Sequence, residues 1–175
     1  MMVVLYKEMV MATRRIREFL DGNSAPYVTI GHSASYTASQ AAQSTHIPGR
    51  YMAKTVIINV DGTLAMAVVP ATQDVNLDAL RRHVFAGDVR LAAESEFARR
   101  FEGCQLGTVP PFGDLFGIKT YIDGEMARRD QIAFMAGTHT DVIVMPMGEY
   151  LRLAKPQQLK LAIKPLGAEC EVVSI

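Results

Sequence analysis

The chain has 175 residues, of which 49% are hydrophobic and 21% are charged, and its 18 basic side chains match its 18 acidic ones. This composition excludes disordered, collagen-like and coiled-coil proteins, and the length is sufficient to bury a core in one domain spanning residues 1–175. A net charge of zero excludes a surface that attracts nucleic acid as a whole. Any nucleic-acid partner would therefore be held weakly, through a local basic patch.

Targeting and redox signals both favour the cytoplasm. Residues 1–20 are apolar and rich in methionine, but charged residues from Lys7 onward interrupt them before a signal-peptide core or a membrane span is complete. The two cysteines, Cys104 and Cys170, lie far apart and form no Cys-x-x-Cys pair, which disfavours a disulfide framework and a cysteine-based zinc site. We therefore expect a soluble, cytoplasmic protein without a membrane partner.

The first predicted elements are a helix, a strand and a second helix. Apolar residues at helical spacing predict a helix over residues 13–21, and the β-branched run of residues 27–30 predicts a strand. Thr37 and Gln40 form the Thr-x-x-Gln start of a capping box, so a helix follows this strand.

A β-hairpin is the clearest local signal in the sequence. Two apolar runs, residues 54–60 and 63–69, flank the pair Asp61-Gly62. This dipeptide is typical of two-residue hairpin turns, because both central positions of such turns need positive φ. The sequence therefore predicts two paired antiparallel strands here.

Lys54 stands at the start of the first hairpin strand. Because side chains alternate along a strand, its ammonium group points to the same face as Val56, Ile58 and Val60. Two interpretations remain open. The lysine reaches water along its own methylene groups, or it meets a phosphate or carboxylate at the rim of a pocket.

The second half of the chain continues the mixture of helices and strands. Asn76 caps a helix that runs to about residue 83, and a second Asp-Gly pair, Asp123-Gly124, closes a later strand. In chain order, the other predicted elements are a strand over 89–91, a helix from 94 that ends at Gly103, strands beginning at 118, 131 and 141, and a helix over 147–153.

The count and order of these elements indicate the fold class. Six or seven strands, joined mostly by hairpins and short turns, alternate irregularly with four or five helices. This pattern favours an α+β fold over a doubly wound parallel sheet. We predict a mixed, mostly antiparallel β-sheet that is curled toward a barrel and flanked by helices.

Common catalytic and cofactor motifs are missing from the sequence. It contains no P-loop, dinucleotide fingerprint, zinc-protease motif or kinase signature, so we expect no cofactor. The stretch Gly31–Ser35 resembles a serine-hydrolase elbow, but Ser35 replaces the glycine that lets the sharp turn form, which disfavours Ser33 as a nucleophile. The four histidines are not spaced as metal ligands, so no metal site is predicted.

Two loops are candidates for a pocket. In residues 107–113, two prolines fix φ and remove two donors, so the remaining amides are suited to bind an anion or a carbonyl oxygen; a stiff surface turn is the alternative. Gly137, Thr138 and His139 stand immediately before an apolar strand, where the end of a strand delivers side chains to the rim of a pocket.

Four stretches, in this order and spacing, resemble the YbaK-type aminoacyl-tRNA deacylases, free-standing relatives of the editing domain inserted in bacterial prolyl-tRNA synthetases. The resemblance extends over about residues 12–155 and so covers nearly the whole chain. The four stretches are HSASYTASQAA, GRYMAKTVIINVDG, GTVPPFG and AGTHTDVIVMP.

The resemblance implies hydrolysis of the ester between a wrongly attached small amino acid and the 3′-terminal adenosine of tRNA, without a metal or a covalent intermediate. The implied partners are the acceptor end of a mischarged tRNA and, secondarily, an aminoacyl-tRNA synthetase. An activated ester needs only an oriented water and donors placed where charge develops on the carbonyl oxygen, so no carboxylate base is required. A non-catalytic module that binds an aminoacyl end or a nucleotide is the alternative.

The family's functional positions fall on particular residues of this chain. Lys54 matches the family's essential lysine, which is thought to secure the acceptor end of the tRNA. The family's Gly-x-x-Pro loop falls on Gly107, Thr108, Val109 and Pro110, and the resemblance implies that backbone amides of this loop face the scissile carbonyl.

Histidines complete the implied site. His139, within the element Gly137-Thr138-His139, matches a position that shapes the amino-acid pocket, and Asp141 follows two residues later. His32 is a further pocket candidate, and a structural role at the end of a strand remains an equal alternative.

Four adjacent arginine pairs offer contacts with the tRNA backbone if some of them share a face of the molecule. A solvated helix surface is the alternative for at least two of the four. The pairs are Arg14-Arg15, Arg81-Arg82, Arg99-Arg100 and Arg128-Arg129.

Overall fold

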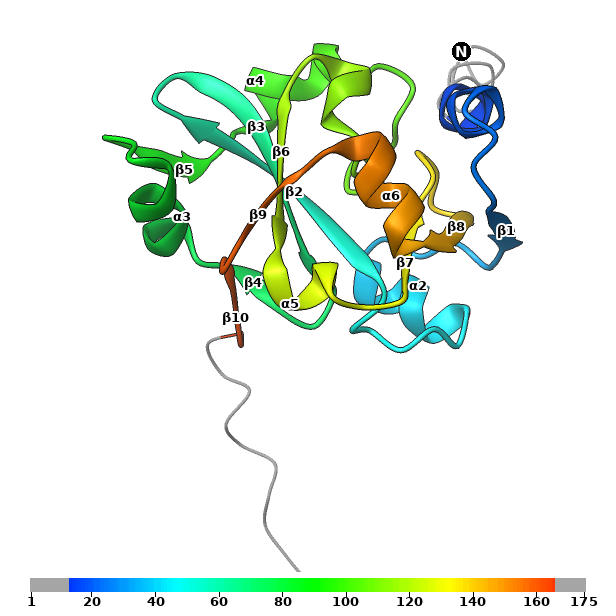
Figure 1. The fold of residues 1–175 in the computed structure, drawn as a ribbon. Coiled ribbons are helices and arrows are strands. Elements are labelled where there is room, and N and C mark those ends of the chain that lie inside the picture. Colours follow the sequence, from blue (N-terminus) through cyan, green and yellow to red (C-terminus); the bar gives the residue numbers. More distant parts are fainter. Residues whose placement is uncertain (1–12, 166–175) are drawn as a thin grey trace, which may run out of the picture.

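The computed structural model describes residues 13–165, and the statements below concern that part of the chain. Its largest sheet has five strands, and the hairpin predicted from the sequence lies at its centre (Figure 1). In spatial order these strands are β5 (Val89–Leu91), β2 (Ala53–Val60), β3 (Thr63–Pro70), β6 (Lys119–Asp123) and β9 (Gln157–Leu159).

Two smaller sheets complete the β-structure of residues 13–165. One has the order β1, β8, β7, formed by Val28–Gly31, Asp141–Pro146 and Gln131–Met135; the other pairs β4 (Asp74–Val75) with β10 (Ala162–Ile163). Five of the seven strand pairings are antiparallel, which confirms the predicted mixed, mostly antiparallel α+β fold. The sheets do not close into a barrel: a single bridge, between Met52 and Ala133, joins the two larger ones.

Helices flank these sheets, and two of them, α2 and α3, begin at the caps that the sequence predicted. The Thr37 hydroxyl accepts a hydrogen bond from the Gln40 amide at 3.2 Å, and the Asn76 side chain accepts one from the Ala79 amide at 2.9 Å. No helix within residues 13–165 is both long and apolar enough to span a membrane. The helices are residues 13–22, α2 (Ala38–Ser44), α3 (Leu77–Val84), α4 (Glu94–Phe97), α5 (Gly124–Ala127) and α6 (Met147–Ala154), with 3₁₀ turns η1 (Ala98–Phe101) and η2 (Gly113–Phe116).

The two Asp-Gly pairs behave differently. Asp61 and Gly62 have φ of 49° and 85° and form the predicted hairpin turn, which places Lys54 opposite Val69. Asp123 instead begins helix α5, because its buried carboxylate accepts hydrogen bonds from the first helical amides. The predicted strand ends at Asp123 as expected, but a helix and not a hairpin turn follows it, and this strand, β6, runs parallel to both of its neighbours.

The core beneath the Gly-x-x-Pro loop is aromatic. The ring of Phe112 makes edge-to-face contacts with Phe19, Phe134 and Tyr150, with centroids 5.2 to 5.6 Å apart, so it joins the N-terminal helix, β7 and α6. Tyr150 is fully buried, and its hydroxyl donates a 2.9 Å hydrogen bond to the carbonyl of Pro111. Burial raises the pKa of the Tyr150 phenol, so the hydroxyl stays protonated and α6 anchors the loop.

We expect Tyr150→Phe to lower the free energy of unfolding by about 1–3 kcal/mol, because the buried Pro111 carbonyl loses its donor while the ring packing remains. Urea denaturation of the two proteins measures this difference. Tyr27→Phe is the matched control, since the Tyr27 hydroxyl bonds an exposed partner, Asp21, and its loss exposes no buried acceptor. Equal destabilisation by the two substitutions would contradict the anchoring role of Tyr150.

Candidate active site

The Gly-x-x-Pro loop docks directly against the Gly-Thr-His element. The Gly137 amide donates to the Thr108 carbonyl at 3.0 Å, and the Gln105 amide donates to the Gly137 carbonyl at 3.0 Å. Gly107 and Gly137 have φ of 81° and 89°, a backbone conformation that favours glycine. Two segments that are about thirty residues apart in the sequence are thus held side by side.

Only part of the loop's hydrogen-bonding capacity is already used. The Thr108 amide and hydroxyl both donate to the Gln105 carbonyl, at 3.1 and 2.8 Å. The amides of Gly107 and Val109 donate to no residue within 13–165. The buried side chains of Thr108 and Val109 hold the backbone in place, so of the three amides that the resemblance pointed to, two remain available as fixed donors.

His139 connects a third element to this site. Its amide donates to Gln105 Oε1 at 2.6 Å, and its Nδ1 lies 2.9 Å from the Ser35 carbonyl oxygen. A carbonyl oxygen only accepts, so Nδ1 is the donor in this contact. The His139 ring also packs against Tyr36 in a tilted arrangement, with centroids 4.8 Å apart. The stretch before α2 therefore meets both loops.

His32 lies in this same stretch. Its amide donates to the Thr140 carbonyl at 2.8 Å, and its Nδ1 lies 2.7 Å from the Ser33 carbonyl oxygen. This geometry again places the proton on Nδ1, while the buried Nε2 has no partner among the described residues. The exposed Ser33 meets His32 through its carbonyl and not through its hydroxyl, which agrees with the low expectation for a Ser33 nucleophile.

Thr138 and Asp141 hold the turn that carries His139. The Thr138 hydroxyl, which is buried, donates to Asp141 Oδ2 at 2.7 Å, and the Thr140 hydroxyl donates to the same oxygen at 3.0 Å. The Arg17 guanidinium lies 3.5 Å from the other oxygen of Asp141. Both carboxylate oxygens are thus engaged, which disfavours Asp141 as a catalytic base.

Lys54 does not share these contacts. Its Nζ forms an ion pair with Asp74 at 2.6 Å, and 30% of its side chain is exposed. As the alternation predicted, Lys54 lies on the face of β2 that carries Ile58, whereas Ile57, on the opposite face, packs with Val109 of the loop. The structure therefore brings together the stretch before α2, the Gly-x-x-Pro loop and the Gly-Thr-His element. The lysine of the remaining element, the hairpin, is paired with the carboxylate of Asp74.

Some contacts of this site were missed by sequence reasoning. Gln105 receives the His139 amide on its side chain and donates its own amide to Gly137, yet nothing in the sequence distinguishes it from other glutamines. Tyr36 lies within the quoted stretch HSASYTASQAA and was not singled out, although an aromatic residue before a helix cap was a usable signal.

Covalent and metal chemistry find little support among the described residues. Burial raises the pKa of the Cys104 thiol to about 11, although Arg15 nearby acts in the opposite direction, so the thiolate is scarce at neutral pH. No group of three or more His, Cys, Asp or Glu side chains within residues 13–165 is arranged to hold a metal ion.

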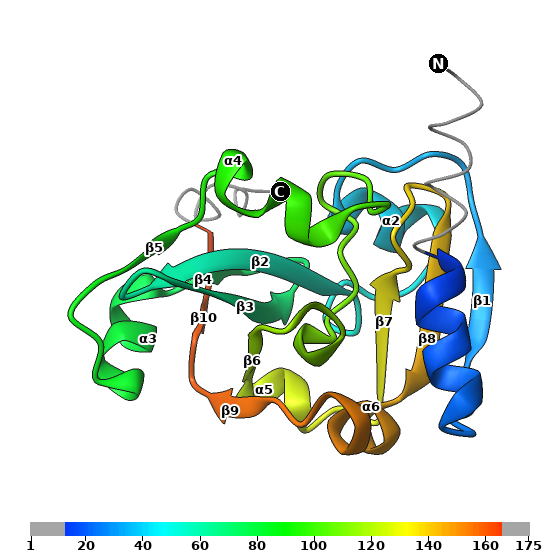
Figure 2. The ribbon, with the colours of Figure 1, turned by 90° about the horizontal axis from the view of Figure 1, so that it is seen from above.

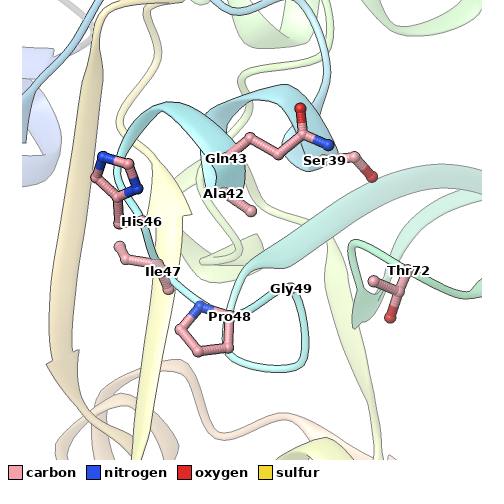
Figure 3. Close-up of a pocket in the computed structure, with 8 residues that line it drawn as sticks. All are labelled: Ser39, Ala42, Gln43, His46, Ile47, Pro48, Gly49 and Thr72. Atoms are coloured by element: carbon pink, nitrogen blue, oxygen red, sulfur yellow. The ribbon is translucent and has the colours of Figure 1, made fainter.

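A separate hollow of about 530 Å³ lies beside the second half of α2 (Figure 3). It is open to solvent, and none of the predicted site residues lines it, since the predicted site adjoins the N-terminal end of α2. Its lining residues are Ser39, Ala42, Gln43, His46, Ile47, Pro48, Gly49 and Thr72.

Known proteins resemble this chain in sequence and in fold. The Multifunctional Ser/Thr-tRNA deacylase ProXp-y of Escherichia coli (strain K12) is 26% identical to the chain over 149 residues, which cover 82% of the chain and 89% of that protein. Among solved structures, hypothetical protein APE2540 is similar with a TM-score of 0.75 at 17% identity, over 85% of the chain and 99% of its own length.

A candidate trans-editing enzyme for prolyl-tRNA synthetase is similar with a TM-score of 0.73 at 22% identity, over 89% of the chain and 98% of its own length. At these identities the two structures support the fold alone. The family described as the aminoacyl-tRNA editing domain matches residues 32–153, a segment that contains the whole predicted site from His32 to His139. The chain belongs to the aminoacyl-tRNA editing domain family.

Proposed function

We propose that the chain is a trans-editing hydrolase that deacylates mischarged aminoacyl-tRNA carrying a small amino acid. The observation that carries this proposal is a pair of amides, at Gly107 and Val109, that have no hydrogen-bond partner among the described residues and lie in a loop stiffened by prolines and docked against Gly137. The family supplies the class of substrate. The Escherichia coli relative is named for Ser- and Thr-tRNA, which favours a small amino acid here as well.

In the proposed reaction, the oxygen of an oriented water forms a bond to the ester carbonyl carbon. Negative charge develops on the carbonyl oxygen, and the amides of Gly107 and Val109 donate hydrogen bonds to it. The bond to the ribose oxygen then breaks, this oxygen takes a proton, and free amino acid and tRNA with a 3′-hydroxyl are released. The substrate's own neighbouring hydroxyl is suited to orient the water, so no protein carboxylate is needed.

Lys54 has the role of anchoring the acceptor end in this proposal. Its ammonium is paired with Asp74, and 53% of the Asp74 side chain is exposed. Partly exposed ion pairs of this kind contribute less than about 1 kcal/mol, so a phosphate or ribose of the tRNA can replace Asp74 at Lys54. In this exchange the ion pair with Asp74 holds the Lys54 ammonium in position until the tRNA binds.

Arginines beyond the loop are suited to contact the tRNA backbone. Arg15 and Arg100 donate to the carbonyls of Leu115 and Phe116, so two positive charges converge on η2, and neither forms an ion pair with an acidic side chain within residues 13–165. Within three of the four arginine pairs, by contrast, one member has a carboxylate on its own helix, one turn away. These neutralised members are Arg14, Arg81 and Arg128.

Deacylation is tested directly with tRNAs charged with alanine, serine, threonine, cysteine or proline, following the loss of the ester. We expect wild type to remove at least one small amino acid faster than buffer does, and Lys54→Ala to lower kcat/KM by about 10- to 150-fold, the value of one charge-assisted hydrogen bond.

Asp74→Asn is the matched variant, because it removes the partner of Lys54 and leaves the lysine in place. It should bind tRNA at least as well as wild type. If no ester is lost faster than in buffer, the hydrolase proposal is wrong and a binding module becomes the better description. If Lys54→Ala is as active as wild type, the anchoring role is wrong.

The proposed amide donors are tested by replacing the Gly107 backbone amide with an ester, which removes the N–H and leaves unchanged the Thr108 carbonyl that binds Gly137. We expect kcat to fall by about 10²- to 10³-fold with little change in the unfolding midpoint, because this amide has no structural partner within residues 13–165. The same replacement at Thr108 should instead lower stability, since its amide bonds the Gln105 carbonyl. Equal kinetic effects at the two positions would contradict the assignment.

The proposed arginine contacts predict that Arg14 and Arg15 contribute differently to the salt dependence of tRNA binding. Arg15→Gln should lower the slope of log affinity for tRNA against log salt by about 1, the effect of losing one phosphate contact. Arg14→Gln should leave the slope unchanged, because Arg14 is already paired with Glu18 at 2.6 Å. Titration of each variant with uncharged tRNA at several salt concentrations gives the slopes, and the opposite order would exclude this patch.

A further inference from the structure

An exposed aromatic ring stands at the edge of the site. Of the Tyr36 side chain and backbone together, 66% is accessible to solvent. Its carbonyl oxygen lies 3.6 Å from the position that a Cβ would occupy on Gly107, so Tyr36 adjoins the residue that offers one of the unused amides. Leu106, on the other side of Gly107 in the sequence, is also 60% exposed. The site is thus bordered by apolar surface that no described residue covers.

The ring of Tyr36 is held in place despite its exposure. It packs on the imidazole of His139 at a centroid distance of 4.8 Å and an interplanar angle of 52°. The His139 ring is in turn fixed by the Ser35 carbonyl, and the Tyr36 amide donates to Gln40 Oε1 at 2.9 Å. An aromatic face that is fixed before binding loses little conformational entropy when a flat ligand stacks on it.

The chemistry of the proposed substrate identifies the ligand for this face. In an aminoacyl ester of a 3′-terminal adenosine, the amino acid lies on the acyl side of the carbonyl and the base lies on the alcohol side. A small aliphatic or hydroxylated amino acid has no aromatic ring, so the adenine is the flat ring system within one nucleoside of the ester. Purine bases stack readily on tyrosine rings.

We propose that Tyr36, supported by His139, is the platform on which the terminal base of the tRNA stacks while the ester lies against Gly107 and Val109. This inference rests on the proposed function and adds a base-binding subsite to it. Tyr36 contacts the substrate outside the reacting atoms, so it acts in binding and not in the chemical step. Its loss therefore raises KM and leaves kcat nearly unchanged.

The test uses a non-hydrolysable analogue, 3′-serylamino-3′-deoxyadenosine, in which an amide replaces the ester, and its cytidine counterpart. Calorimetric titration of wild type, Tyr36→Phe and Tyr36→Ala measures both affinities. We expect wild type and Tyr36→Phe to prefer the adenosine analogue. Tyr36→Ala should weaken its binding by about 5- to 150-fold, the range found for one base–aromatic stack, with a smaller loss for cytidine.

Phe85→Ala is the control for a general effect of removing an exposed aromatic ring, because Phe85 is 95% exposed and caps α3 away from the site (Figure 1). It should match wild type in every titration. If Tyr36→Ala binds both analogues as wild type does while wild type still deacylates tRNA, the base platform is wrong and the hydrolase proposal stands. If wild type binds neither analogue and removes no ester, both proposals fail.

A structural role of Tyr36 gives a different pattern from a base platform. Damage to the loops would weaken the two analogues by the same factor and lower kcat together with affinity. Equal losses for adenosine and cytidine would therefore overturn the inference. Loss of the preference for adenosine, at an unchanged melting temperature and an unchanged kcat, would support it.

Discussion

Two backbone hydrogen bonds at Gly137 hold the candidate site together. One runs from the Gly137 amide to Thr108 and the other from Gln105 to the Gly137 carbonyl, and both need the left-handed backbone that glycine adopts without strain. Through them the turn before β8 and the loop before η2 become one surface. His139 then adds the third segment through the Ser35 carbonyl. Everything proposed for the reaction depends on this docking, because it fixes where the unused amides point.

The support behind this surface is apolar and comes from distant parts of the chain. Phe112, immediately after the prolines, packs among aromatic rings of the N-terminal helix, β7 and α6. The Tyr150 hydroxyl holds the Pro111 carbonyl of the loop by a hydrogen bond. Figure 2 shows the N-terminal helix lying beside β1 and β8, where the Thr13 hydroxyl reaches the Ala136 carbonyl. A loop held by buried rings on one side and by backbone bonds on the other needs no movement to present its donors.

Much of the fold followed from local signals, because those signals act over a few residues. The hairpin turn, the caps at Thr37 and Asn76 and the alternation that orients Lys54 are of this kind. The very short strands β4, β9 and β10 were not predicted, since their pairing depends on residues far away in the sequence. The resemblance located the site's segments, but Gln105 and Asp74 became visible only as spatial neighbours of His139 and Lys54.

The segment after residue 155 has a structural role that the extent of the resemblance did not suggest. The likeness ended at about residue 155, yet β9 extends the large sheet, and the amides of Leu161 and Ala162 bind the second oxygen of the buried Asp123. One residue further, Ile163 pairs with Asp74, the acidic partner of Lys54. The segment after residue 155 thus helps to position the carboxylate that pairs with Lys54 and that, in the proposed mechanism, is displaced by tRNA. If Lys54 anchors tRNA as proposed, substitutions in that segment change substrate affinity without altering the residues of the site itself.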